Sequence, residues 1–138
     1  MLFESALYKD IIKRYNLRKG KEIEKLALFF LANSATEFSF ASAAKAIGLK
    51  SHLTAQKYLG YLGEAYIFFT VNNFSFKTKQ QAKSKKIYCF DNGIITAKAF
   101  QASQNLGKLF ENLVAIHLKK QEIGGQLDLY YWKNHLDL

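Results

Sequence analysis

The sequence predicts an α+β fold, mainly helical with a small β-hairpin: a winged helix-turn-helix followed by a truncated helix–strand segment. Apolar residues recur at helical spacing through the first half of the chain, two short helices meet at a glycine turn near residue 48, and β-rich runs flank a lysine-rich loop. Two helices joined by a tight turn form the motif that offers its second helix to a DNA groove. A hairpin with a basic loop directly after that pair is typical of a winged helix.

Two helices are expected before residue 34, separated by Gly20. The first spans residues 2–18 and should bury Phe3, Leu7, Ile11, Ile12 and Tyr15. The second spans residues 21–33, ends in a turn at residues 33–36, and should bury Ile23, Leu26, Ala27, Phe30 and Leu31.

The helix pair follows. Ser39 is a candidate N-cap for a helix through Ile47, and Gly48 is the left-handed stop that such a helix needs. Ser51 can cap a second helix running to about residue 66. Its apolar face is expected to comprise Ala55, Tyr58, Leu59, Leu62, Ala65 and Tyr66. The opposite side carries His52, Leu53, Gln56, Lys57, Gly60 and Glu64.

On that outer side, three residues are candidates for DNA contact: His52, Gln56 and Lys57. Gln56 could read an adenine edge, and Lys57 a guanine or a phosphate. Leu53 offers only apolar contact, however, and Glu64 would repel the DNA backbone. The face therefore favours phosphate contacts over base reading, and a structural or partner-binding role remains open.

The hairpin loop is basic. From residue 65 to residue 90 there is no Asp or Glu, and that window holds Lys77, Lys79, Lys83, Lys85 and Lys86. The whole chain has a net charge of +9, carried by lysines apart from Arg14 and Arg18. Lysine suits phosphate contact, whereas arginine supplies bidentate base recognition. Non-specific binding of duplex DNA is the expected outcome.

The C-terminal part begins with a turn at residues 91–93, followed by a short helix over 94–100. A longer helix is expected from Leu106 to about Gln121, with Leu109, Leu113, Val114, Ile116 and Leu118 on its apolar face. After Gly124 and Gly125, residues 127–132 alternate like a strand. A lone strand leaves both of its edges unpaired, so we expect the segment to belong to a longer protein.

Several classes of function lack support in the sequence. There is no membrane-length apolar run, no signal-peptide layout and no phosphate-binding glycine loop. The single cysteine, Cys89, is expected in the core, and His52, His117 and His135 are too widely spread for a metal site. We therefore expect a cytoplasmic protein. We also expect that this segment binds no cofactor and catalyses no reaction.

Five strings lie in order along the chain: DIIKRYNLR at 10–18, YLGYLGEAYIFF at 58–69, FSF at 74–76, KIYCFDNGI at 86–94 and NLGKLFENLVAIHL at 105–118. Together they resemble the C-terminal half of a group of prokaryotic AAA-type P-loop ATPases of unknown function. The resemblance implies three parts. Residues 1–22 would form the helix that follows an ATPase core, residues 23–93 the winged helix domain, and residues 94–138 the helical segment and first strand of a truncated restriction-endonuclease-like domain.

The resemblance also implies partners and a site. The longer protein would bind ATP and a divalent metal, could form oligomers, and would pack this segment against its own ATPase domain. Glu111 matches a metal-binding glutamate of the nuclease-like fold, which also needs two carboxylates and a lysine on the following strands. Asp128 and Asp137 do not match those positions cleanly. The alternative to a metal-binding role is that Glu111 is an exposed helical carboxylate that pairs with Lys108. The alternative to DNA binding is that the whole segment is a structural adaptor.

Overall fold

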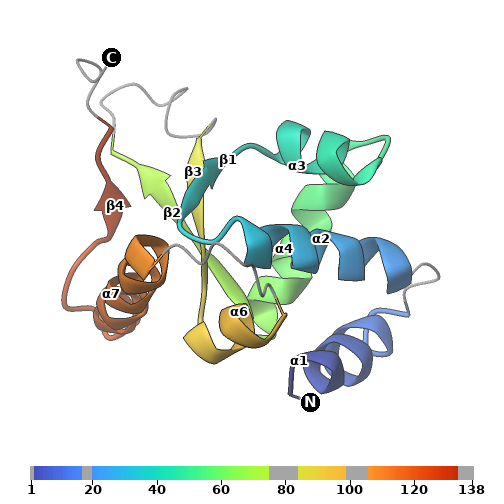
Figure 1. Cartoon of the computed structure of the whole chain (residues 1–138), viewed down its shortest axis with the longest axis horizontal. Helices are drawn as coiled ribbons and strands as arrows, with labels where there is room; N and C mark the ends of the chain where they lie inside the picture. Colours follow the sequence, from blue (N-terminus) through green and yellow to red (C-terminus); the bar gives the residue numbers. More distant parts are fainter. Residues whose placement is uncertain (1, 17–19, 75–83, 99–105, 134–138) are drawn as a thin grey trace.

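The computed structural model describes residues 2–16, 20–74, 84–98 and 106–133 and confirms the α+β class (Figure 1). The helices are α1 (Leu2–Ser5), the π-helix η1 (Ala6–Ile12), α2 (Gly20–Ala32), α3 (Phe40–Ile47), α4 (His52–Glu64), α6 (Asn92–Lys98) and α7 (Leu106–Ile123). The strands are β1 (Thr36–Phe38), β2 (Phe68–Asn73), β3 (Lys85–Cys89) and β4 (Tyr130–Tyr131).

The N-terminal helix does not remain α-helical. It begins as α1 and becomes the π-helix η1, followed by a turn to residue 16. The predicted burial of Phe3, Leu7 and Ile11 is confirmed, and Ile12 and Tyr15 pack at the edge of the same core. The segment therefore contributes an apolar face to the main core.

Capping interactions fix the helix pair. The Ser39 hydroxyl accepts a hydrogen bond from the Ser42 amide at 3.1 Å, and the Ser42 hydroxyl accepts one from the Ser39 amide at the same distance. Gly48 ends α3 with a φ of 77°, the left-handed conformation predicted for it, and Ser51 caps α4 by accepting from the Leu53 amide at 3.2 Å. Two serine side chains and the left-handed backbone of one glycine thus set three of the four helix ends in this pair.

The inner face of α4 is largely as predicted, with one error. Ala55, Tyr58, Leu59 and Leu62 are buried. Tyr66 was expected to join them but is exposed, because α4 ends at Glu64 and Tyr66 adopts a φ of 56° in the turn that leads to β2. Its ring contacts the edge of Phe90 at the surface instead.

One four-stranded sheet, in the order β1-β3-β2-β4, organises the described residues. β2 and β3 are antiparallel, with Phe68 opposite Cys89 and Asn72 opposite Lys85, and β1 is antiparallel to β3. β4 pairs in parallel with β2, and the Phe74 amide donates to the Tyr131 carbonyl at 2.8 Å. The last strand is therefore shorter than predicted and is not alone, since one of its edges pairs with β2.

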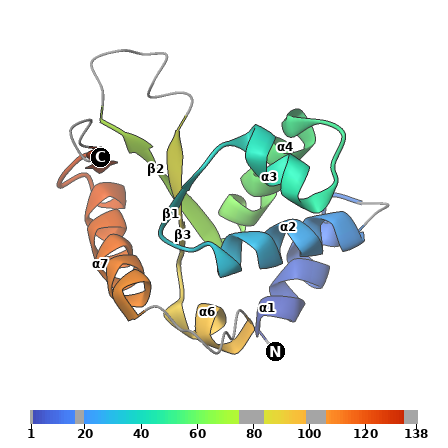
Figure 2. The same ribbon diagram turned by 45° about the horizontal axis from the view of Figure 1, so that its top comes forward.

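Helices cover both faces of this sheet (Figure 2). Side chains alternate along β3, so Ile87 and Cys89 join the core formed with α2, α3 and α4, whereas Tyr88 faces α7. Figures 1 and 2 both show α7 on the opposite side of the sheet from α2, α3 and α4. The second core contains Ala35, Phe69, Val71, Tyr88, Ala115, Ile116 and Tyr131.

The buried face of α7 matches the prediction only in part, since Ile116 is buried and Leu109 packs against the main core as expected. Asn112, Ala115 and Ile116 are the buried residues, while Leu113 and Val114 are more than half exposed. The helix is rotated relative to its apolar pattern because Asn112 makes hydrogen bonds to the sheet, described below. An apolar pattern alone could not reveal that polar anchor.

Two glycines allow a paired test of these helix assignments. Gly60 lies inside α4 with nothing within 4 Å of the position a Cβ would take, whereas Gly48 has a φ of 77°. We expect Gly60→Ala to raise the free energy of unfolding by about 0.5–1 kcal/mol, because alanine favours the helix more than glycine does. Gly48→Ala should lower it by about 1 kcal/mol, because a Cβ disfavours the left-handed conformation. Urea denaturation of both variants measures this, and an equal effect of the two would contradict the assignment.

Candidate nucleic-acid interface

The N-terminal half of α4 presents the predicted contact residues to the outside. His52, Leu53, Gln56 and Lys57 are all exposed. Figures 1 and 2 show that α4 begins on the same side of the molecule as the end of β2 and the start of β3. The helix and the base of the hairpin are thus arranged so that one extended ligand could touch both.

The hairpin lysines fall into two groups. Lys77, Lys79 and Lys83 lie outside the described residues. Lys85 is half-buried, and its Nζ donates to Asn72 Oδ1 at 2.7 Å. Lys86 faces α7, where its Nζ lies 3.2 Å from Glu111 Oε2 and 5.5 Å from the centre of the Tyr131 ring. Because its charge already meets a carboxylate, Lys86 is a weaker candidate for phosphate contact than the sequence suggested.

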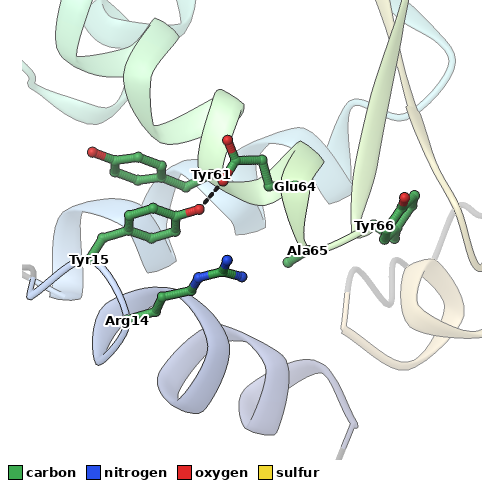
Figure 3. A pocket seen from close by; sticks show the side chains of 6 residues that line it. All are labelled: Arg14, Tyr15, Tyr61, Glu64, Ala65 and Tyr66. Atoms are coloured by element: carbon green, nitrogen blue, oxygen red, sulfur yellow. Dashed lines mark hydrogen bonds between the residues drawn. The ribbon is translucent and has the colours of Figure 1, made fainter.

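The C-terminal half of α4 is covered by the N-terminal segment (Figure 3). The rings of Tyr15 and Tyr61 stack with centroids 3.9 Å apart, and the Tyr15 hydroxyl donates to Glu64. An open hollow of about 240 Å³ lies beside them, with Arg14 on its wall. Ligand pockets are usually larger, from roughly 300 Å³ upward. We interpret the contact as a junction that covers part of the second half of α4, although Gly60 and Glu64 stay exposed, and leaves the first half accessible.

Glu111 on α7 is held by residues of β3. Its Oε2 accepts hydrogen bonds from Lys86 Nζ at 3.2 Å and from the Tyr88 hydroxyl at 3.0 Å. Burial, followed by the charge of Glu111, raises the pKa of Tyr88 well above its usual value. Lys108, the partner considered from sequence, also donates to the Ala35 carbonyl at 2.9 Å.

Asn112 forms a second link between α7 and β3. It is fully buried; its Nδ2 donates to the Cys89 carbonyl at 2.8 Å and to Asn92 Oδ1 at 2.6 Å. Its Oδ1 accepts from the Cys89 amide at 2.8 Å, so the side chain pairs with both backbone groups of one residue. The Asn92 Nδ2 in turn donates to the Leu109 carbonyl at 3.1 Å. We call Glu111 and Asn112 together the α7 clamp.

The predicted metal site is not assembled by the described residues. Glu111 is engaged by a lysine and a tyrosine, Asp128 is exposed, and Asp137 and His135 lie outside the described part. Within the described ranges there is no group of three or more His, Cys, Asp or Glu side chains that could hold a metal ion. A metal at Glu111 therefore stays a prediction about a larger nuclease-like domain.

The geometry defines a small basic α+β unit with an exposed helix, and the comparisons place it in a family. Residues 2–105 match a domain of unknown function, DUF8612, and the chain belongs to that family. It is 33% identical over 134 residues to the uncharacterized protein MJ1544 of Methanocaldococcus jannaschii. The alignment covers 94% of this chain but only 30% of that relative. No solved structure matches the chain.

The family match ends immediately before α7, so the α7 clamp lies beyond it. The described helices include none with the length and apolar character needed to cross a bilayer.

The α7 clamp predicts a large cost for one substitution and a small cost for its neighbour. Asn112→Ala leaves the Cys89 amide and carbonyl buried without their partners, so we expect the free energy of unfolding to fall by about 2–4 kcal/mol. Glu111→Gln keeps an acceptor for the Tyr88 hydroxyl at a partly exposed position and should cost less than about 1 kcal/mol. Urea titration gives both values. Equal costs would show that Asn112 does not anchor the helix.

Burial makes the Cys89 thiol unreactive. Burial first, then the charge of Asp91, raises the pKa of Cys89 to about 11, outweighing the lowering effect of a hydrogen bond with the Asp91 backbone. The neutral thiol therefore contributes stability that is complete below the unfolded pKa of 9.0 and is lost as the pH rises towards 11.

We expect thiol labelling at pH 8 to proceed only as fast as unfolding, and stability to decline between pH 9 and 10. A Cys89→Ala variant should show a shallower decline over that interval. Rapid labelling of the native protein would contradict the buried position.

Proposed function

We propose that this chain is a winged-helix segment that binds duplex DNA, mainly through phosphate contacts made by the N-terminal half of α4 and the base of the hairpin. The observation that carries the proposal is the exposure of His52, Gln56 and Lys57 on one uncovered half of α4. In helix-turn-helix proteins, the N-terminal residues of the second helix make the contacts to base edges in the major groove.

The order of elements supports the winged-helix interpretation. α2, β1, α3, α4, β2 and β3 follow one another, and the three strands form an antiparallel sheet in the order β1-β3-β2. The hairpin follows directly after the second helix of the pair. The net charge of +9 adds a long-range attraction for a polyanion.

The available side chains favour phosphates over bases. Lys57 is a flexible point charge, and Lys85 is oriented by Asn72 at the base of the hairpin. Arg14, a possible bidentate reader, lies beside the Tyr15 ring at 5.7 Å. Binding that depends on lysine and phosphate should vary strongly with salt and little with DNA sequence.

We also propose, from the family resemblance, that the segment works within a longer cytoplasmic AAA-type ATPase. The chain spans only 30% of the relative MJ1544, so such a protein has room for an ATPase domain. ATP, a divalent metal and any nuclease activity would belong to that larger protein. Measuring ATP hydrolysis by the longer protein, with and without duplex DNA, tests this proposal.

A specific observation favours the alternative role as a protein-interaction module. Four apolar residues on α7 are more than half exposed and share one helical face: Leu106, Phe110, Leu113 and Val114. Exposed apolar patches of this kind often mark interfaces. The two carboxylates of α7 are engaged elsewhere, because Glu111 pairs with Lys86, and Glu122 pairs with Lys119 and accepts from the Leu129 amide. An adaptor that packs this face against the ATPase domain would bind with or without DNA.

A matched pair of lysine substitutions tests the DNA proposal. Lys57→Ala removes a cation from the exposed half of α4, whereas Lys120→Ala removes one from the exposed face of α7, on the other side of the sheet. We expect Lys57→Ala to weaken binding of a random duplex and to reduce the slope of log affinity against log salt by about 0.9. Fluorescence anisotropy between low and moderate salt measures both.

Lys120→Ala should change neither quantity. If both variants lost affinity by the same factor, binding would depend on net charge alone and not on a site on α4, which would contradict the proposal. Absence of duplex binding at low salt would also reject it. Retained co-purification with the ATPase domain after nuclease treatment, lost in Phe110→Ser, would support the adaptor role instead.

A further inference from the structure

An exposed group of three aromatic side chains lies at the β4 edge of the sheet, and α4 does not contribute to it. Phe74 is 41% exposed, Tyr130 47% and Trp132 69%. The Phe74 ring lies 5.8 Å from Tyr130, edge to face, and 5.9 Å from Trp132 at an interplanar angle of 33°. We call these three residues the aromatic platform.

Backbone pairing holds the platform in place. Tyr130 lies opposite Asn72 in the parallel pairing of β4 with β2, and the Phe74 amide donates to the Tyr131 carbonyl. Tyr131 turns inward to the core beneath α7, so Tyr130 and Trp132, one residue to either side, turn outward to the opposite face. The outward direction of Tyr130 and Trp132 therefore follows from the alternation of side chains about the buried Tyr131.

The charges near the platform favour an anion. Asn72 also lies opposite Lys85 across the hairpin, and its Oδ1 accepts from Lys85 Nζ. This places a cation on β3, with strand β2 between it and Tyr130 on β4. Neither β2 nor β3 contains an Asp or Glu. Asp128 is the acidic residue nearest to Tyr130 in sequence, and Lys133 next to Trp132 pairs with Glu37 at 3.1 Å. Overall the chain carries a charge of +9.

We propose that the aromatic platform binds the unpaired bases of a single-stranded nucleic acid, with Lys85 contacting a neighbouring phosphate. Exposed aromatic rings beside a cation provide stacking surfaces that bind bases with little sequence preference. In a duplex the base faces are already stacked on one another, so the ligand must offer unpaired bases. The three rings lie outside α4, but Lys85 at the base of the hairpin also belongs to the proposed duplex interface, so the two sites adjoin. The stacking surface itself does not depend on duplex binding.

The chain contains a single tryptophan, and it belongs to the platform. Trp132 fluorescence therefore reports binding at the site itself. We expect an oligothymidylate of about 12 nucleotides to quench this fluorescence. An abasic oligonucleotide of the same length and charge should quench it much less, because it has no bases to stack.

Substitutions then separate stacking from charge. Tyr130→Ala and Phe74→Ala should each weaken binding of the oligothymidylate by about 10-fold, a factor that corresponds to the usual contribution of stacking for one base. Trp132→Phe, followed by anisotropy of a labelled oligonucleotide, should retain most of the affinity because a ring remains. Leu113→Ala, which removes an exposed apolar side chain from α7, is the matched control and should have no effect.

The outcomes are distinct. Selective quenching by the base-containing strand, together with the losses in Tyr130→Ala and Phe74→Ala, supports the platform. Equal quenching by the abasic strand, no quenching at all, or unchanged affinity in both variants overturns it. Quenching by an acidic amphipathic peptide but not by oligothymidylate would also overturn it and would make the platform a protein-docking site. Duplex binding that is lost in Lys57→Ala but retained in Tyr130→Ala would support a stacking surface that serves unpaired bases and not the duplex.

Discussion

Strand β3 is the element on which the rest of the structure depends. It pairs with β1 on one side and β2 on the other, so it is the central strand of the three-stranded antiparallel portion. Ile87 and Cys89 anchor the core under α2, α3 and α4, and Tyr88 anchors the core under α7. At its end, both backbone groups of Cys89 pair with Asn112. Because one short strand serves two cores, movement of β3 would disturb both helical layers at once.

This arrangement also determines which surfaces remain accessible. The N-terminal segment covers the second half of α4 through Tyr15 and Tyr61, and α7 covers one face of the sheet. The exposed half of α4, the apolar face of α7 and the aromatic platform remain open. They lie on different elements and differ in chemistry: the first is polar and cationic, the second is mainly aliphatic with one phenylalanine, and the third is aromatic.

Features set by local chemistry could be predicted from the sequence. Ser39, Gly48 and Ser51 mark helix ends because capping depends on neighbouring backbone groups. Features set by distant contacts could not. Lys86 meets Glu111, 25 residues away, which the charge pattern of the hairpin did not reveal. Asn112 determines the buried face of α7 against the apolar pattern, and Tyr66 leaves the apolar face because the chain must turn into β2. The platform was missed because its rings come from strands paired across more than fifty residues.

The two outer strands of the sheet have a consequence for solubility. β1 has three residues and β4 has two, whereas the inner strands β2 and β3 have six and five. An outer strand exposes unpaired amides and carbonyls that can recruit another chain, and keeping it short limits how many hydrogen bonds a foreign strand can form. In a chain whose residues are 49% hydrophobic, these short edge strands disfavour edge-to-edge aggregation.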